Sequence, residues 1–291
     1  MSTKVTIGFI GLGVMGYPMA GHLAGAGHDV RIYNRSAAKA ERWLTQYPGH
    51  RAATPRAAAD AADFVFTIVG NDDDVRSVAY GDDGLFAGVR PGAVFIDNTT
   101  TSAELARELA AAAAERDCGF VDAPVSGGQA GAEAGQLTVM AGGDAQAFAA
   151  AKPVISAYAK SIAHMGPAGR GQLTKMVNQI CIAGVLQGLA EGLRFAELAG
   201  LELEDVVHVI AHGAAQSWQM DNRHTTMARG DFDFGFAVDL MRKDLDIVMR
   251  TGSALDAPLE LTQMVDRFYA DVQALGGGRW DTSSLIERLR R

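Results

Sequence analysis

The sequence has little cysteine and little positive charge, and these shortages exclude several classes of protein. It contains 2 cysteines in 291 residues, Cys118 and Cys181, which do not form a CxxC pair. A disulfide framework or a metal site such as a zinc site is therefore not expected. The net charge is −8 at pH 7, and no run of basic residues occurs. Because nucleic acids are bound through their phosphates by basic faces, a nucleic acid is not an expected partner.

Long apolar runs are scarce as well. We find no stretch with the roughly 18 apolar residues of a membrane span, so no membrane partner is expected. A β-rich run begins by Val5, and we expect no signal peptide before it. These features predict a cytoplasmic protein. The apolar content of 48% is ample for buried cores, and the length suits two domains.

A glycine motif stands between a predicted strand and a predicted helix. Residues 5–10 form an apolar, β-rich run, and GLGVMG follows at 11–16, comprising Gly11, Leu12, Gly13, Val14, Met15 and Gly16. In this context the first glycine permits a tight turn, the second a close approach of a pyrophosphate, and the third close packing of helix and strand. The motif predicts dinucleotide binding at a helix N-terminus, whereas the plain alternative is an ordinary tight turn.

The predicted second strand, residues 29–33, ends at Asn34 and Arg35. An acidic residue at this place would hydrogen-bond the ribose of NAD and repel a 2′-phosphate. Asn34 lacks that charge, and the guanidinium of Arg35 suits a phosphate. We therefore predict a preference for NADP(H). The alternative is that Arg35 stacks over the adenine, in which case NAD(H) binds as well.

Strand-like and helix-like segments alternate up to about residue 166. This alternation predicts a parallel sheet with helices on both faces, a doubly wound sheet of the Rossmann type. Ligands of such sheets bind beyond the carboxyl ends of the strands, which places Val69 and Thr100 beside the cofactor. Thr100 has a plain alternative, since loop threonines often cap the next helix. We expect residues 136–141 to form a strand and Gly142-Gly143 to form a turn.

Small residues follow a proline in the segment DAPVSGG at 122–128. The exposed N–H groups of Ser126, Gly127 and Gly128 suit a carboxylate, although a plain glycine loop has the same composition.

From residue 167 to 291 only helical periods occur, and we predict an all-α domain that begins with a long helix from about 169 to 199. Because the apolar residues of this helix lie on nearly all of its sides, it is expected to be buried. Lys175 lies near its start with Gln179 on the same face, and a buried lysine needs a partner. This pattern predicts a polar pocket, whereas a surface lysine at a frayed helix end is the alternative. We expect Gly200 to end this helix, and further helices at about 203–212, 237–253 and 258–275.

A polar and aromatic stretch at 216–225 contains Trp218, Arg223 and His224. These side chains are candidates for a pocket lining, although a tryptophan more often belongs to a core and an arginine to a solvated surface.

Four separated motifs together resemble the β-hydroxyacid dehydrogenase family over nearly the whole chain. They are GFIGLGVMGYPMA at 8–20, DAPVSGGQAGAEAGQLTVMAGG at 122–143, GRGQLTKMVNQ at 169–179 and FGFAVDLMRKDL at 234–245. The family includes 3-hydroxyisobutyrate dehydrogenase and tartronate semialdehyde reductase. The resemblance implies a hydride transfer between NADP(H) or NAD(H) and a small substrate that carries a carboxylate.

The resemblance also assigns roles to individual residues. It makes Lys175 the catalytic acid and base, and places Ser126, Gly127 and Gly128 on the substrate carboxylate. It implies that Thr100 and Lys243 touch the cofactor and that Gln179, Phe236 and Asp244 touch the substrate, with Trp218 contributing to substrate choice. One departure is Val69-Gly70, where members often have Leu-Pro.

Two alternatives share this architecture. Imine reductases usually replace the lysine that this chain keeps, and non-catalytic scaffold relatives have lost it. The apolar helical domain also predicts an oligomer, either a homodimer or a homotetramer.

Overall fold

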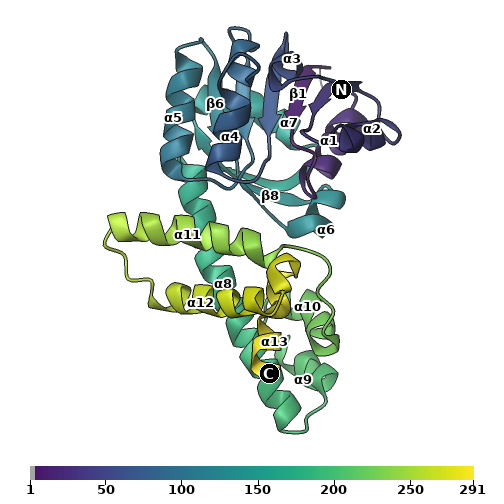
Figure 1. The fold of residues 1–291 in the computed structure, drawn as a ribbon, viewed down its shortest axis with the longest axis vertical. Helices are drawn as coiled ribbons and strands as arrows, with labels where there is room; N and C mark the ends of the chain where they lie inside the picture. The colour runs from purple at the N-terminus through teal and green to yellow at the C-terminus, as the bar shows by residue number, and fades with distance from the viewer. Residues whose placement is uncertain (1–3) are drawn as a thin grey trace. The chain divides into compact units, whose positions relative to one another are not determined.

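The computed structural model describes residues 4–291, and the contacts divide them into two compact units (Figure 1). The first unit runs to Lys175, and the second runs from Met176 to Arg291. The division falls within the long helix α8 (Arg170–Leu198). The boundary expected between residues 166 and 167 stays a prediction.

The first unit is built around one twisted sheet. Its strand order is β3-β2-β1-β4-β5-β6-β8-β7, with β9 paired to β8. The part from β3 to β6 is parallel and has the order of a doubly wound nucleotide-binding sheet. The order reverses between β1 and β4, and loops at such a point leave room for a ligand. The strands are β1 (Thr6–Ile10), β2 (Asp29–Tyr33), β3 (His50–Arg51), β4 (Phe64–Thr67), β5 (Val94–Asp97), β6 (Gly119–Asp122), β7 (Val125–Ser126), β8 (Leu137–Gly143) and β9 (Ala159–His164).

Two apolar cores lie on the two faces of this sheet. Successive side chains of a strand point to opposite faces, so Phe66 enters the core under α1, α2 and α7 while Val65 enters the core under α3, α4 and α5. Figure 1 shows α4 and α5 side by side, apart from α1 and α2. The predicted doubly wound architecture is confirmed. The helices are α1 (Gly16–Gly25), α2 (Ala37–Leu44), α3 (Pro55–Ala59), α4 (Asp72–Ala79), α5 (Ala103–Ala114), α6 (Gly128–Glu133) and α7 (Ala145–Ile155), with the 3-10 turn η1 (Leu85–Ala87).

The end of the sheet differs from the sequence expectation in two respects. Strand β8 runs antiparallel to β6 and β7, so the sheet is not parallel throughout. Gly142 and Gly143, expected to form a turn, continue β8 and pair with Asp122 and Val121. The expectation of a turn was wrong because Gly142 serves close packing. A Cβ atom at Gly142 would lie 2.6 Å from Asp122 Oδ1 and 2.7 Å from the nitrogen of Gly171.

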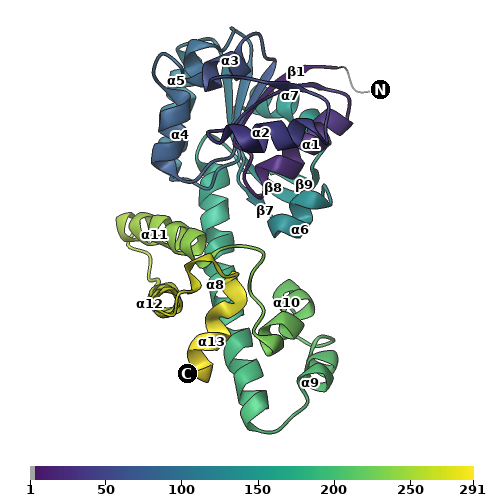
Figure 2. The same cartoon turned by 45° about the vertical axis from the view of Figure 1, so that its right-hand side comes forward.

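The second unit is helical, as predicted. Its helices pack around a core to which α8 contributes Leu186, Ala190 and Leu193. Helices α11 and α12 pack against each other, as do α9 and α10 (Figure 2). Gly200 ends α8 in a left-handed conformation (φ +70°), as expected. The other helices are α9 (Leu203–Ile210), α10 (Trp218–Arg229), α11 (Val238–Ala254), α12 (Glu260–Ala274) and α13 (Leu285–Arg290), with the 3-10 turns η2 (Gly277–Arg279) and η3 (Thr282–Ser284).

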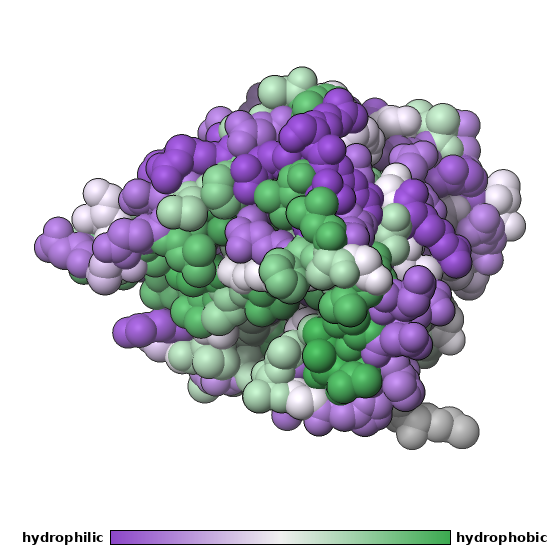
Figure 3. All heavy atoms as spheres, turned by 90° about the horizontal axis from the view of Figure 1, so that it is seen from below, coloured by the Kyte–Doolittle hydropathy of each residue, from purple (hydrophilic) through white to green (hydrophobic). Residues whose placement is uncertain are grey.

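Helix α8 is only partly buried in the single chain. Phe195 is 72% exposed and Val177 is 59% exposed, so the expectation of burial on every side holds for one face only. An 18-residue window of α8 also reaches a mean hydropathy of 1.2, with 44% of the window buried. By length and composition α8 is therefore long and apolar enough to cross a membrane, which the sequence analysis did not expect. The core helix of a soluble protein can have the same length and composition. Figure 3 shows apolar side chains gathered on the face seen from below.

Helix α10 covers the polar stretch for which the sequence predicted no helix. Its apolar periodicity is weak, because among its residues Met220 and Met227 are the buried ones. Its end signals are present in the sequence, however. The Ser217 side chain accepts a hydrogen bond from the N–H of Met220, and Gly230 ends the helix with φ +72°. A capping serine and a left-handed glycine bracket a helix even where the apolar stripe is faint.

Candidate active site

The glycine-rich loop connects β1 to α1 and has no room for side chains at two of its three glycines. A Cβ atom at Gly11 would lie 2.1 Å from the carbonyl oxygen of Ile68, and one at Gly16 would lie 2.0 Å from that of Gly11. At Gly13 nothing lies within 4 Å, so its exposed backbone is open to a ligand. The first and third glycines therefore serve packing, and the second leaves the surface that a pyrophosphate requires.

Asn34, at the end of β2, fixes the shape of this loop. Its Oδ1 accepts a hydrogen bond from the N–H of Leu12 at 2.9 Å, and its Nδ2 donates to the carbonyl of Ser36 at 3.0 Å. Arg35 beside it is exposed. The N-terminus of α1, the open backbone at Gly13 and the end of β2 thus fit a dinucleotide at the place where such sheets bind one.

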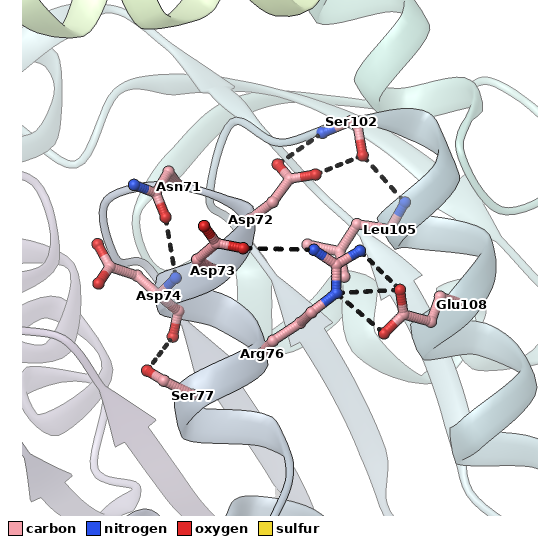
Figure 4. A network of polar contacts seen from close by, with 9 residues as sticks. All are labelled: Asn71, Asp72, Asp73, Asp74, Arg76, Ser77, Ser102, Leu105 and Glu108. Atoms are coloured by element: carbon pink, nitrogen blue, oxygen red, sulfur yellow. Dashed lines mark hydrogen bonds and ion pairs between the residues drawn. The ribbon is translucent and has the colours of Figure 1, made fainter.

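The loops after β4 and β5 are tied together. The N–H of Val69 donates to Thr99 Oγ1 at 3.1 Å, and Asp72 accepts hydrogen bonds from the backbone and the side chain of Ser102 (Figure 4). Below these contacts, Arg76 makes a two-pronged ion pair with Glu108, which joins α4 to α5. Val69 is therefore held against the loop that contains Thr100.

Helix α4 and helix α5 each begin with a side-chain cap in the same network. Asn71 Oδ1 accepts from the N–H of Asp74, and Ser102 Oγ accepts from the N–H of Leu105 (Figure 4). The residue that caps α5 is therefore Ser102, the second residue after Thr100. Thr100 itself is half-buried.

Two buried aspartates end neighbouring strands of the sheet. Asp97 at the end of β5 accepts from Thr67 Oγ1 at 2.7 Å and from the N–H of Thr99 at 3.0 Å. Burial raises the pKa of Asp97 to about 6 against the opposing effect of these hydrogen bonds. Burial likewise raises the pKa of Asp122, at the end of β6, to about 6, although backbone N–H groups of Gly169 and Gln172 favour its charged form.

Helix α8 begins at Arg170, where its first turn is bonded to Asp122, and Lys175 lies in its second turn. Lys175 is 7% exposed, so it is a buried lysine rather than a surface residue at a frayed end. Gln172, one turn earlier, is fully buried. The beginning of α8 thus combines an ammonium group, an amide and a carboxylate next to the carboxyl ends of β5 and β6.

The segment Ser126-Gly127-Gly128 joins β7 to the short helix α6. Gly127 has φ +129° and Gly128 has φ +62°, values that favour glycine. Nothing lies within 4 Å of a Cβ atom placed at Gly128, whereas Gly127 packs against Leu137. Successive N–H groups in a turn of this kind suit an anion.

In the second unit, three predicted site residues form one cluster. Gln179 is 3% exposed, and its Nε2 donates to Asp244 Oδ2 at 2.6 Å. Lys243 Nζ lies 2.7 Å from Asp244 Oδ1. The half-buried Phe236 is fixed through its backbone N–H, which donates to Asp281 Oδ2 at 2.9 Å.

Arg223 is neither solvated nor free in the second unit. Its guanidinium carbon lies 4.9 Å from the ring centres of both Trp218 and Phe234, and its Nε lies 3.5 Å from Asp281 Oδ1. Trp218 is 48% exposed, so it is not a core tryptophan. His224 Nδ1 contacts the carbonyl of Met220 at 2.8 Å, a bond within α10.

Asp97, Asp122 and Gln172 were not singled out as site residues by sequence reasoning. The available signal was that polar residues end two neighbouring parallel strands, in Ile96-Asp97 and Val121-Asp122. A charged residue at the carboxyl end of an otherwise apolar strand is worth marking, because ligand sites gather there.

Comparison with known proteins identifies the family. Residues 6–166 match the family described as the NAD binding domain of 6-phosphogluconate dehydrogenase. Residues 169–289 match the NAD-binding family of NADP-dependent 3-hydroxyisobutyrate dehydrogenase. An uncharacterized oxidoreductase of Shewanella frigidimarina is 58% identical over 98% of both chains. A probable 3-hydroxyisobutyrate dehydrogenase-like protein of Arabidopsis thaliana is 39% identical over 99% of this chain and 95% of its own.

The chain belongs to the β-hydroxyacid dehydrogenase family. A solved structure agrees with this membership: 3-hydroxyisobutyrate dehydrogenase of Mycobacterium tuberculosis with L-serine is 34% identical, with a TM-score of 0.89, and the match covers 99% of this chain and 100% of that one. The protein is therefore an NAD(P)-dependent hydroxyacid dehydrogenase.

Proposed function

We propose that the protein transfers a hydride between NADP(H) and a small β-hydroxyacid or its semialdehyde, with Lys175 as the general acid and base. The observation that carries this proposal is the burial of Lys175, 7% exposed, in the second turn of a helix that starts at the strand ends. Lysine is almost never buried without a role or a partner. The bound nicotinamide supplies the hydride chemistry, and the residues of the chain bind, orient and move a proton.

In this proposal, Lys175 Nζ gives a proton to the carbonyl oxygen during reduction and takes one from the hydroxyl during oxidation. A positioned acid or base of this kind contributes roughly 10²–10⁴-fold to the rate. The N–H groups at Ser126, Gly127 and Gly128 hold the substrate carboxylate. This carboxylate-binding role is supported by the positive φ angles at the two glycines and by the open space beside Gly128.

The preference for NADP(H) over NAD(H) rests on Asn34 and Arg35. Both hydrogen-bonding groups of Asn34 already serve the backbone of Leu12 and Ser36, and neither carries the charge that would repel a 2′-phosphate. The exposed guanidinium of Arg35 is available next to it. We further propose that the Gly11–Gly16 loop, Val69, Thr100 and Lys243 contact the cofactor.

The proposed substrate contacts in the second unit are Gln179, Phe236 and Asp244, with Trp218 contributing to substrate choice. The resemblance of these residues to family motifs suggests these roles, and the cluster of Gln179, Lys243 and Asp244 supports a joint function. We also propose that the protein is a cytoplasmic homodimer or homotetramer. The exposed apolar side chains of α8, such as Phe195 and Val177, support association.

A substrate screen tests the proposed reaction. Purified protein is assayed for NADPH and NADH oxidation with succinic semialdehyde, tartronate semialdehyde and a cyclic imine, and for reduction of NADP⁺ and NAD⁺ with 3-hydroxyisobutyrate, glycerate and L-serine. We expect turnover of a carboxylate-bearing substrate with NADP(H) preferred. Turnover of the imine alone would favour an imine reductase, and no turnover above a blank would overturn the proposal.

The role of Lys175 is tested by the substitution Lys175→Ala, with Lys152→Ala as the matched control because Lys152 is exposed on α7. With the best substrate of the screen, Lys175→Ala is expected to lower kcat by about 10²–10⁴-fold while NADPH binding, followed by protein fluorescence, is retained. Lys152→Ala is expected to leave kcat unchanged. A turnover of Lys175→Ala near that of the original protein would refute the assignment.

The cofactor preference is tested by the substitutions Asn34→Asp and Arg35→Ala. A carboxylate at position 34 can still accept from the N–H of Leu12 but repels a 2′-phosphate, so the ratio of kcat/KM for NADPH over NADH should fall by about tenfold or more. Arg35→Ala should lower the same ratio by removing the cation. A ratio already below one in the original protein, or one that neither substitution moves, would contradict the preference for NADP(H).

A further inference from the structure

Asp122 holds the first turn of α8 against the carboxyl end of β6. Its Oδ1 accepts a hydrogen bond from the N–H of Gly169 at 2.8 Å, and its Oδ2 accepts one from the N–H of Gln172 at 2.9 Å. The first N–H groups of a helix have no partner within the helix. A glycine precedes the first residue of α8 and offers no side chain, so a carboxylate 47 residues earlier in the chain acts as the cap.

Gln172 ties the same turn to the loop after β5. Its side-chain oxygen accepts from the N–H of Thr101 at 3.0 Å, and its side-chain nitrogen donates to the carbonyl of Thr99 at 2.7 Å. Gln172 is fully buried, so water does not compete for these bonds. The two bonds lie on either side of Thr100, which is the proposed cofactor contact in this loop.

The backbone around Asp122 leaves the helix no room to shift. A Cβ atom at Gly171 would lie 2.4 Å from the carbonyl oxygen of Met140 and 2.6 Å from that of Asp122. One at Gly142 would lie 2.9 Å from the nitrogen of Arg170. The start of α8 therefore packs backbone against backbone, and the buried side chains of Asp122 and Gln172 hold its first turn in place.

We propose that Asp122 and Gln172 are positioning residues that set the place of the Lys175 ammonium group relative to the Thr99–Thr101 loop. Gln172 precedes Lys175 by three residues and lies on the same side of the helix, so a displacement of one moves the other. Neither residue needs to touch the reacting atoms. The inference rests on the proposed role of Lys175 and adds the contacts that fix the position of its ammonium group.

A double-mutant cycle between Gln172 and Lys175 tests the inference. Methionine at position 172 has a similar length and shape but makes neither hydrogen bond. With the best substrate of the screen, Gln172→Met is expected to lower kcat by about 10- to 100-fold, as a misplacement of about 1 Å does. In the Lys175→Ala background there is no ammonium left to misplace, so Gln172→Met should change kcat by less than about twofold.

The outcomes separate the inference from the proposed function. Near-original turnover of Lys175→Ala, or the absence of any substrate in the screen, overturns the proposed function and the inference with it. A strong effect of Lys175→Ala together with an equal fold-loss from Gln172→Met in both backgrounds overturns the inference alone, because the loss then does not pass through Lys175. Unchanged kcat in Gln172→Met overturns it as well.

A second variant keeps the test valid if Gln172→Met does not fold. Asp122→Asn preserves the shape of the side chain but turns an amide donor toward one of the two N–H groups, and it enters the same cycle with the same expected coupling. The matched control is Asp144→Asn, since Asp144 caps α7 through the N–H groups of Gln146 and Ala147 at 2.8 and 3.1 Å. The control is expected to leave kcat unchanged, whereas Asp122→Asn lowers it only when Lys175 is present.

Discussion

The two units of this protein satisfy their buried charges in different ways. In the first unit, Asp97 and Asp122 are held by backbone N–H groups and a hydroxyl, at the ends of strands and at the start of a helix. In the second unit, backbone N–H groups also hold the buried Asp281, but partly buried charged side chains meet each other as well, as in the pairs Arg290–Glu197 and Arg242–Asp266. Backbone groups have positions fixed by secondary structure, whereas ion pairs join long side chains that must be ordered first.

This difference affects how firmly the proposed catalytic residues are positioned and how the stability of the fold depends on pH. The hydrogen bonds of the first unit fix the loops and the helix turn that carry the proposed catalytic residues. They hold carboxylates whose pKa is raised by burial, so the charged form costs stability. In the second unit, burial opposes the charge of Glu197, but its hydrogen bonds to Arg290 and Arg194 lower its pKa and stabilise the charged form instead. Opposite responses to pH are therefore expected from Asp97 and Asp122 on one side and Glu197 on the other.

The largest effect is expected at Gly142, where the backbone of strand β8 packs closely against the start of α8. Gly142→Ala places a methyl group within 2.6–2.9 Å of Asp122 Oδ1 and the backbone nitrogens of Gly171 and Arg170. We expect a loss of about 3 kcal/mol or more in the free energy of unfolding, since such overpacking cannot be relieved by a flexible side chain. Urea unfolding measures it. Gly25→Ala is the control, because nothing lies within 4 Å of its Cβ position, and a loss of equal size there would break the argument.

The second-largest effect is expected from the buried carboxylate of Asp97, on the pH dependence of the free energy of unfolding. Its raised pKa means that the folded state binds a proton more tightly than the unfolded state, so stability is fully present below the unfolded pKa near 3.8 and is lost as pH rises through about 6. The difference between a pKa of 3.8 and one of about 6 corresponds to about 3 kcal/mol. Asp97→Asn keeps an oxygen for Thr67 and Thr99 and should remove most of this pH dependence. Parallel stability curves for the two proteins between pH 4 and pH 7.5 would contradict the prediction.

The smallest effect is expected for the ion pairs of the second unit. Burial opposes the charge of Glu197, but hydrogen bonds from Arg290 and Arg194 outweigh it and lower the pKa. Its contribution is therefore present above the unfolded pKa and is lost as pH falls. We expect Glu197→Gln to cost about 1–2 kcal/mol at pH 7 and less at pH 3.5.

The matched control for Glu197→Gln is Asp246→Asn, which breaks the exposed pair with Arg250 and should cost less than about 0.5 kcal/mol. Thermal unfolding at the two pH values compares both variants. A cost for Glu197→Gln that grows on acidification would overturn the contrast between the two units.

The sequence predicted those features that depend on local pattern. The strand, glycine loop and helix at residues 6–25 follow from a short apolar run, three glycines and helical spacing, and the long helix with Lys175 follows from its apolar period. Helix α10 was missed because its apolar stripe is faint, although Ser217 and Gly230 mark its ends. The role of Gly142 was misjudged because a glycine pair normally indicates a turn, and only its neighbours in space show that it serves close packing.

Local sequence thus determined the kind of fold, the dinucleotide loop and a lysine on a mostly apolar helix, because each of these depends on residues only a few positions apart. The tertiary structure alone decided what surrounds that lysine. Asp122 and Gln172 are 50 residues apart in the chain, and Gln172 is 71 and 73 residues from the two loop residues that it bonds. Such contacts depend on which strand ends lie side by side, and this is settled by the packing of the whole sheet rather than by any short stretch of it.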